Sequence, residues 1–256
     1  MNTGELLDYL RVDILHDNSQ QVAGSGDDQL WSDTSLIRNI NEAYKRWARL
    51  TYSIRDATTT AVTEVTLVEG TTEYTLHKSV IAVISARLEG QTYDLGRAGH
   101  SIFQSYYNPS TRFWDPEHFA TLSPGAVIAF STDEGVTSTA GAGGKVRLRV
   151  YPEPDATMDG EKIYLRVVRG PIADLSLATP TVEPEISDDH HVEMLDWAAY
   201  LCLRTVDLDE GAPDRAQEFK AAFEANVLEA KKLAVRKLFA PKKWGFGRNA
   251  FQPWER

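Results

Sequence analysis

The sequence contains a single cysteine and no long hydrophobic run, and each shortage excludes a class of structure. Cys202 cannot form a disulfide within the chain, and it falls on an apolar helical face, where we expect a small core residue rather than a reactive thiol. No apolar stretch approaches the roughly 20 residues that cross a bilayer. Residues 1–5 lack the basic and apolar regions of a secretory signal, so we expect a protein that is made and used in a cytoplasm, or in something assembled there.

The composition is that of a globular protein whose charge is unevenly spread. The 256 residues, 42% of them hydrophobic and 25% charged, suffice for one large domain or two modest ones. Residues 231–256 hold eight lysines and arginines and one glutamate, a net charge of +7. Residues 1–230 therefore carry −17, which gives the total of −10. This asymmetry indicates contact with an acidic surface of protein or nucleic acid.

Apolar residues recur at helical spacing near both ends of the chain. A first helix is predicted to end before Asn18, and Ser32 to Thr34 supply N-cap chemistry for a second. Towards the other end, Ser187 is predicted to cap a helix and Pro213 to open a long final one. Helices are therefore expected at both ends of the chain.

Polar and apolar residues alternate in the middle of the chain, which predicts strands at 64–67, 145–151 and 161–168. The apolar run 80–88 predicts another strand, which turns at Glu89-Gly90. The expected fold class is α+β: a helical bundle formed by the N- and C-terminal helices, with an inserted antiparallel β module and an extended C-terminal arm. The predicted segments are 1–58 (N-terminal helices), 59–180 (β module), 181–240 (C-terminal helices) and 241–256 (arm).

Candidate catalytic and metal-binding patterns fail on physical grounds. Segment 141–145 is superficially like a phosphate loop, but Val146 stands where a Ser or Thr would bind magnesium, and no helix follows. The best metal candidate is 188–193, yet His190 and His191 point about 100° apart on a helix and cannot share one ion. The sequence therefore predicts no catalytic residue, no metal site and no cofactor, and we expect a protein that is not an enzyme.

Basic residues on two strands form the first candidate interface. Strands 145–151 and 161–168 are predicted to pair as a hairpin, which would set like charges opposite each other and destabilise the ladder by some tenths of a kcal/mol per pair, a rough figure. The acidic body of an identical subunit would remove this conflict; the alternative is a hairpin whose cations are simply solvated. The residues concerned are Lys145, Arg147, Arg149, Lys162 and Arg166.

The last sixteen residues, 241–256, form the second candidate interface. Two prolines and two glycines prevent a long helix, yet four aromatic side chains would each gain about 1.5–3 kcal/mol on full burial. This composition is typical of an arm that docks into the groove of a partner. The alternatives are an arm that folds back on its own domain or stacks on nucleic acid. The candidate docking residues are Lys242, Lys243, Trp244, Phe246, Arg248, Phe251 and Trp254.

Four stretches resemble the head-to-tail adaptor proteins of tailed bacteriophages. The early helix of that family is similar to Trp31-Ser-Asp-Thr-Ser-Leu-Ile-Arg-Asn-Ile-Asn-Glu-Ala-Tyr44. Its first β-hairpin is similar to residues 68–76, and its later strand pair to residues 150–155 and 163–171. Its closing helix pair is similar to residues 186–206 and 212–237.

This resemblance implies a structural virion protein with no catalytic residues to carry over. It implies a dodecameric ring that binds the portal protein above and tail or nozzle proteins below, around a channel through which DNA passes without specific binding. It also implies that a C-terminal segment grips the portal, which assigns that role to residues 241–256. The expected location is the head-tail junction of the virion, after assembly in the host cytoplasm, with no membrane partner.

Two other functions stay open. A tail-associated module would recognise a receptor or a carbohydrate through an aromatic loop that contains Phe103, Tyr106, Tyr107, Phe113 and Trp114. A hydrolase would bring carboxylates and histidines together in a deep pocket. The loops at 97–125 and 131–145 exceed the minimal pattern of the adaptor family, so no contact is assigned to them.

Overall fold

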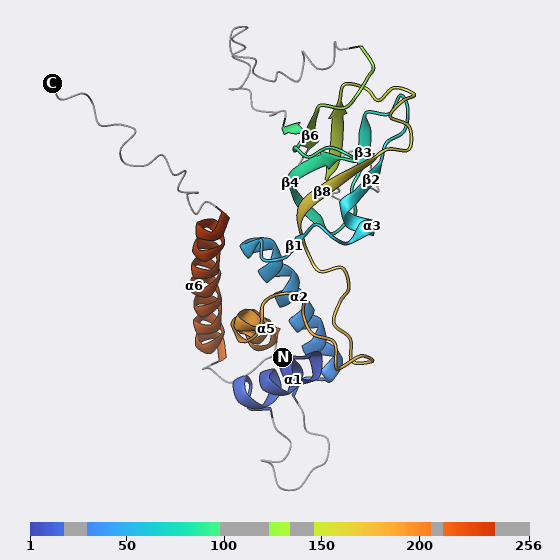
Figure 1. Ribbon diagram of the computed structural model, residues 1–256. Coiled ribbons are helices and arrows are strands. Elements are labelled where there is room, and N and C mark those ends of the chain that lie inside the picture. The colour runs from blue at the N-terminus through green and yellow to red at the C-terminus, as the bar shows by residue number, and fades with distance from the viewer. Residues whose placement is uncertain (18–29, 98–122, 134–145, 206–211, 239–256) are drawn as a thin grey trace, which may run out of the picture. The chain divides into compact units, whose positions relative to one another are not determined.

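The chain divides into two units in the computed structural model, which describes residues 1–17, 30–97, 123–133, 146–205 and 212–238. Unit 1 comprises Met1–Thr51 and Ser176–Arg256, and unit 2 comprises Tyr52–Leu175 (Figure 1). Unit 1 contains helices and unit 2 contains the strands, so the α+β class is confirmed. None of the helices in the described ranges is long and apolar enough to cross a membrane.

The helices of unit 1 begin and end largely at the predicted signals. Helix α1 (Thr3–Asp8) continues into a π-helical turn (Tyr9–Ile14), and α2 (Asp33–Thr51) follows Ser32, whose hydroxyl accepts a hydrogen bond from the Ser35 amide. A 3-10 turn (Asp188–His190) leads into α5 (His191–Thr205), and α6 spans Ala212–Leu238. The side chain of Ser187 caps no backbone amide and contacts Asp189 instead, so the predicted hydroxyl cap is wrong.

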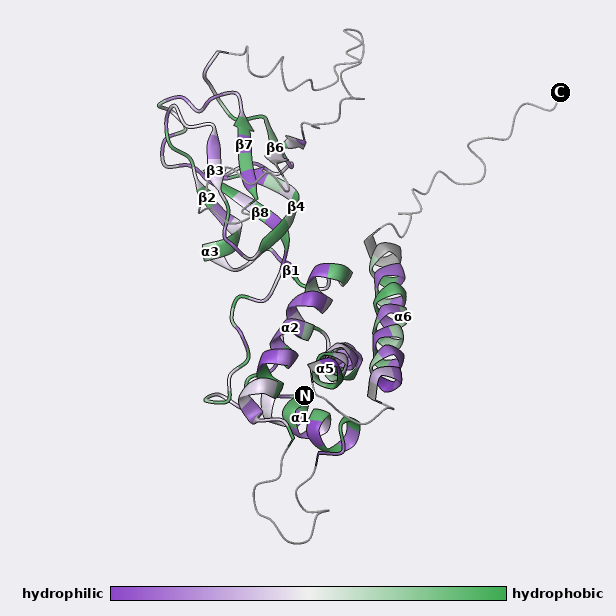
Figure 2. Ribbon diagram, turned by 180° about the vertical axis from the view of Figure 1, so that it is seen from behind, coloured by the Kyte–Doolittle hydropathy of each residue, from purple (hydrophilic) through white to green (hydrophobic). Residues whose placement is uncertain are grey.

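Aromatic side chains hold the helices of unit 1 together. Trp47 of α2 is fully buried, and its ring lies 5.7 Å from that of Phe223 on α6. Trp197 of α5 lies 5.2 Å from the same Phe223 ring, so one side chain of α6 contacts both neighbouring helices. Large buried rings such as Phe223 contribute about 3–5 kcal/mol each, judged by truncation to alanine. In Figure 2, α6 carries both hydrophobic and hydrophilic residues along its length.

Unit 2 contains two antiparallel sheets that share one core, with a parallel strand pair at one edge. The first sheet holds β1 (Arg55–Asp56), β8 (Lys162–Arg169) and β2 (Glu64–Thr66) in that order, and β4 (Val80–Leu88) also pairs with β8. The second sheet has the order β3 (Glu73–Thr75), β7 (Arg147–Tyr151), β6 (Ala129–Asp133) and β5 (Gly96–Arg97). A short helix, α3 (Thr60–Thr63), precedes β2.

The predicted pairing of strands 145–151 and 161–168 is wrong. The two segments form β7 and β8, which lie in different sheets. Their apolar side chains, such as Leu148 and Leu165, are buried in the shared core between the sheets. Residues 68–76, which resemble the first β-hairpin of the adaptor family, also form no hairpin. They run from the end of β2 in one sheet into β3 of the other. Alternation identifies a strand and its buried face, but not the strand beside it.

Candidate functional site

The basic residues of β7 face acids rather than other cations. Arg149 lies opposite Glu73 of β3 in the strand register, and its guanidinium forms an ion pair with the Glu73 carboxylate. The Nη1 atom of Arg147 lies 3.4 Å from Oε2 of the same carboxylate. The hydrogen bond with Glu73 raises the pKa of Arg149 and so favours its charged form. The expected repulsion between like charges is absent here, because the strand beside β7 supplies an acid.

Lys162 and Arg166 lie on β8, in the other sheet, and only one of them has an acidic partner. The Nζ atom of Lys162 lies 3.0 Å from Oε2 of Glu64 on β2, and this hydrogen bond raises the pKa of Lys162. Arg166 is exposed and lies opposite Ser85 of β4. Within the described ranges no carboxylate forms an ion pair with Arg166.

The remaining predicted interface residues lie outside the described residues. Lys145 is one of them. The others are the arm residues Lys242, Lys243, Trp244, Phe246, Arg248, Phe251 and Trp254. The aromatic loop of the receptor-binding alternative and the segment 141–145 also lie outside the described residues. Their roles stay predictions.

The two neighbouring histidines at the start of α5, His190 in the preceding 3-10 turn and His191 in the helix, take separate structural roles. Nδ1 of His190 lies 2.7 Å from Oε2 of Glu193, and the His190 ring packs on Trp47. His191 is fully buried, and burial lowers its pKa. Its Nε2 lies 3.2 Å from the carbonyl oxygen of Ile186. In the part of the chain that the structure describes, no three His, Cys, Asp or Glu side chains gather closely enough to hold a metal ion.

Cys202 is a core residue, as the sequence predicts. Its side chain is fully buried, and the amide of Asn39 on α2 donates a hydrogen bond to Sγ at 3.2 Å. Burial raises the pKa of the thiol to about 11. A thiol with this pKa carries almost no thiolate at neutral pH, so it is a poor nucleophile.

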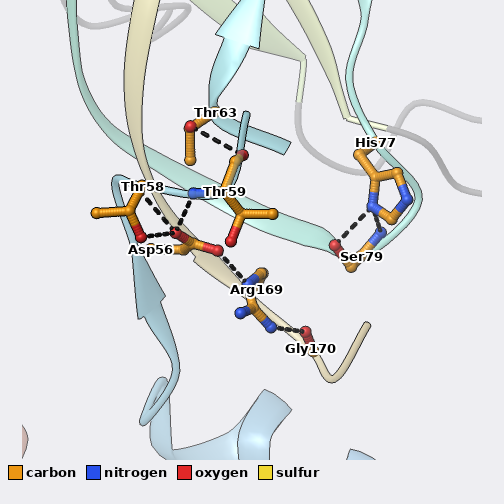
Figure 3. A network of polar contacts seen from close by, with 8 residues as sticks. All are labelled: Asp56, Thr58, Thr59, Thr63, His77, Ser79, Arg169 and Gly170. Atoms are coloured by element: carbon orange, nitrogen blue, oxygen red, sulfur yellow. Dashed lines mark hydrogen bonds and ion pairs between the residues drawn. The ribbon is translucent and has the colours of Figure 1, made fainter. Parts of the chain in front are cut away.

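A buried ion pair that the sequence analysis missed lies where the chain enters and leaves unit 2 (Figure 3). Nε of Arg169, on β8, donates a hydrogen bond to Oδ2 of Asp56, on β1, at 2.7 Å. The amides of Thr58 and Thr59 donate to the other carboxylate oxygen at 2.9 and 3.0 Å. Burial raises the pKa of Asp56, but these hydrogen bonds outweigh it and hold the pKa well below its usual range.

This ion pair joins the first and the last strand of unit 2. Asp56 lies opposite Val167 in the register of β1 and β8, and the Arg169 amide donates to the Ile54 carbonyl at 3.0 Å. Nη1 of Arg169 also donates to the Gly170 carbonyl at 3.2 Å, and the Gly170 amide donates to Ser79. The sequence contains one signal for this arrangement. Asp56 precedes Thr58 and Thr59, and an aspartate at such a position often accepts hydrogen bonds from the backbone amides two and three residues later.

Arg87 is a third residue that the sequence analysis missed, after Asp56 and Arg169. It is exposed on β4 and lies opposite Tyr164 of β8. Arg166 is two residues further along β8, so Arg87 and Arg166 are diagonal neighbours on the outer face of the first sheet. The run 80–88 is apolar apart from Ser85 and Arg87, and the register with β8 was needed to place Arg87.

The chain was also compared with known proteins. No curated protein matches it. Residues 1–242 match the family described as SU10 adaptor protein. The match spans both units and ends within the predicted arm, before Lys243. Since far more than half of the sequence is covered, the chain belongs to the SU10 adaptor protein family, a family of structural head-to-tail adaptors of tailed phages.

Proposed function

We propose that twelve copies of this chain form a ring beneath the portal and link the portal to tail or nozzle proteins. The observation that supports this function most is the family match over residues 1–242, which includes both the helices of unit 1 and the inserted β module. A structural role also agrees with the chemistry of several described residues: Arg149, Lys162 and Arg169 form ion pairs with acids of neighbouring strands, and His191 and Cys202 are buried in the helical unit.

The proposed contact with the portal is made by the C-terminal arm, residues 241–256. Its four aromatic side chains are costly to leave in water, and its lysines and arginines favour an acidic groove. The adaptor then stays monomeric until the portal supplies the groove, and the ring forms on the portal.

Deletion of residues 241–256 tests this assignment. The truncated chain is expected to keep its fold, because both cores lie within residues 6–230, and to lose binding to purified portal. Mass measurement of each protein alone and mixed with portal provides the readout, and circular dichroism checks the fold. Binding that is unchanged by the deletion would rule out the arm as the portal contact.

A matched variant separates aromatic anchoring from charge. Replacement of Trp244, Phe246, Phe251 and Trp254 by alanine keeps every lysine and arginine of the arm. If the aromatic side chains anchor the arm, this variant binds as weakly as the truncated chain. If charge alone holds the arm, it binds like the full chain at low salt.

The proposed channel is acidic and lets DNA pass without specific contacts. Residues 1–240 carry a net charge of −13, since the total is −10 and the arm carries +3. An acidic wall repels phosphates and keeps the DNA from adhering to it. The truncated chain is therefore expected not to retard duplex DNA in a gel at physiological salt. A stable complex under these conditions would contradict the acidic channel.

A further inference from the structure

The outer face of the first sheet carries two arginines that have no ion-pair partner among the described residues. We call this surface the arginine face, and it consists of Ser85 and Arg87 of β4 with Tyr164 and Arg166 of β8. Arg87 lies opposite Tyr164, and Ser85 lies opposite Arg166, so all four side chains leave the same side of the sheet. Both arginines are exposed, whereas Ala86 and Leu165 on the other side are buried.

Two acids on this side of the sheet, Glu64 and Glu89, already accept hydrogen bonds from residues other than the two arginines. Glu64 lies 3.0 Å from Lys162, and Glu89 accepts a hydrogen bond from the Tyr164 hydroxyl at 3.3 Å. Among the described residues, neither Arg87 nor Arg166 has an ion-pair partner. Like charges at neighbouring positions of a ladder disfavour it, and an acid from another molecule would remove that penalty.

A complementary surface lies on α6, which we call the acidic strip: Ala221, Ala225 and Leu228, flanked by Glu218, Glu224 and Glu229. With about 100° between successive residues, Ala221, Ala225 and Leu228 lie opposite the face that holds Phe223, Ala216 and Ala230 in the core, and the glutamates lie to either side of them. All six are exposed, and the Leu228 side chain keeps 54% of its surface in contact with solvent. The centre of the strip is apolar and its rims are negative.

We propose that the arginine face of one copy packs on the acidic strip of a second copy. The two surfaces match in charge, since Arg87 and Arg166 meet the glutamates of the rims. They also match in polarity, because the Tyr164 ring and the aliphatic stems of the arginines cover the small apolar centre. Arginine suits this role, as its planar guanidinium forms two hydrogen bonds with one carboxylate.

This contact rests on the proposed ring function and identifies the partner of the β module within the ring. It joins two different surfaces, one on unit 2 and one on unit 1, so each copy still offers one free surface of each kind. Contacts of this heterologous type continue from copy to copy and close into a ring when the rotation between copies permits. A contact between two identical surfaces would stop at a dimer.

Cysteine crosslinking tests the contact in the full chain, alone and on purified portal. Ser85→Cys places a thiol on the arginine face and Ala225→Cys places one in the acidic strip, and both leave the charged residues in place. A short bifunctional maleimide is expected to link the two variants only when they are mixed. The wild-type chain serves as the control, because its one thiol, Cys202, is buried.

The outcomes separate this contact from the ring function. Crosslinks within either variant alone, or portal-bound copies that give no mixed crosslink, overturn the contact and leave the adaptor function standing. Mixed crosslinks without any portal binding support the contact and contradict the adaptor function. If neither crosslinks nor portal binding are observed, both are wrong.

Charge reversal gives a second, independent test. On purified portal, Arg166→Glu is expected to reduce association between copies at least tenfold, whereas Lys78→Glu makes the same charge change at an exposed position away from the arginine face and leaves association unchanged. Adding Glu224→Lys to Arg166→Glu restores opposite charges across the contact and recovers association. Equal effects of Arg166→Glu and Lys78→Glu, or no recovery in the double variant, would show that net charge alone is responsible.

Discussion

At the scale of single residues, the buried pair Asp56–Arg169 is the most sensitive position in unit 2. Asp56→Asn keeps the oxygen that accepts from Thr58 and Thr59 but removes the carboxylate charge that faces the buried Arg169 guanidinium. We expect a loss of about 3–5 kcal/mol in the free energy of unfolding at neutral pH. Urea unfolding measures it. Glu73→Gln, which breaks a partly exposed pair, is the control and costs about 0–1 kcal/mol.

The same substitution has a defined pH dependence. The pKa of Asp56 in the folded protein lies below its value in the unfolded chain, about 3.9. Its stabilising contribution is therefore complete above the unfolded value and is lost as the pH falls through the folded value. The stability difference between wild type and Asp56→Asn should be constant near neutral pH and shrink below about pH 4. A difference that grows on acidification would contradict this assignment.

Tyr52, the residue that follows α2, carries backbone strain. Its φ of 53° is in the left-handed region, where a large side chain is disfavoured. Asparagine tolerates this conformation better, and Tyr52→Asn is expected to raise the free energy of unfolding by about 0.5–1 kcal/mol. Thermal unfolding measures the change. The exposed position Tyr93, whose backbone φ is not positive, is the control, and Tyr93→Asn should bring no comparable gain.

At the scale of elements, the contact between α5 and α6 includes a carboxylate in an unfavourable setting. Burial raises the pKa of Asp196 to about 6, against the hydrogen bond that it accepts from the Asn226 amide at 3.2 Å, and Glu193 raises it further. The charged form therefore weakens the packing of the two helices. The pKa of Asp196 is raised in the folded protein. The contribution of Asp196 to the free energy of unfolding is therefore lowest once the pH has risen above about 6.

Asp196→Asn removes this charge and keeps the contact with Asn226. We expect it to stabilise the protein at pH 7 by about 1 kcal/mol, less than the full pKa shift implies, because the side chain remains partly solvated. Below about pH 4 the gain should vanish, since aspartate is then protonated in both states. Melting temperatures of the two proteins across this pH range provide the comparison, and a gain that is independent of pH would refute the role of the charge.

Much of this element structure could be predicted from the sequence, whereas the neighbours of each strand could not. Helical spacing located α2, α5 and α6, and alternation located β7 and β8. The pairing of β7 with β8 was inferred from their short connection alone, and the connection instead crosses between two sheets that share a core. Partner choice depends on packing between distant segments, which local periodicity does not contain.

The candidate interface was predictable only in part for the same reason. The like-charge argument selected Arg147, Arg149 and Lys162, each of which faces an acid on a neighbouring strand. It also selected Arg166, which keeps no such partner within the described ranges. Arg87 became visible only once β4 was placed beside β8. Charge patterns along one strand are informative when the residues across the ladder are known.

At the scale of the whole molecule, unit 2 has what it needs to fold by itself. The core cluster, which includes Leu67, Phe130 and Leu165, lies entirely between residues 62 and 167. The pairing of β1 with β8 ties the two ends of the unit together. A fragment of residues 52–175 is expected to unfold cooperatively in urea, as an independent domain does. In the same fragment Asp56→Asn should lower the midpoint strongly, and a fragment without a cooperative transition would contradict its independence.

The pairing of β1 with β8 also determines which domains could replace unit 2. Since β1, the first strand of unit 2, pairs with β8, its last strand, the chain enters and leaves this sheet at points about one strand spacing apart, roughly 5 Å. A folded domain whose own ends lie at that separation can replace unit 2 without displacing the segments that lead to α2 and α5. Recombination at these positions can therefore exchange the β module while the sequence of the helices is inherited unchanged.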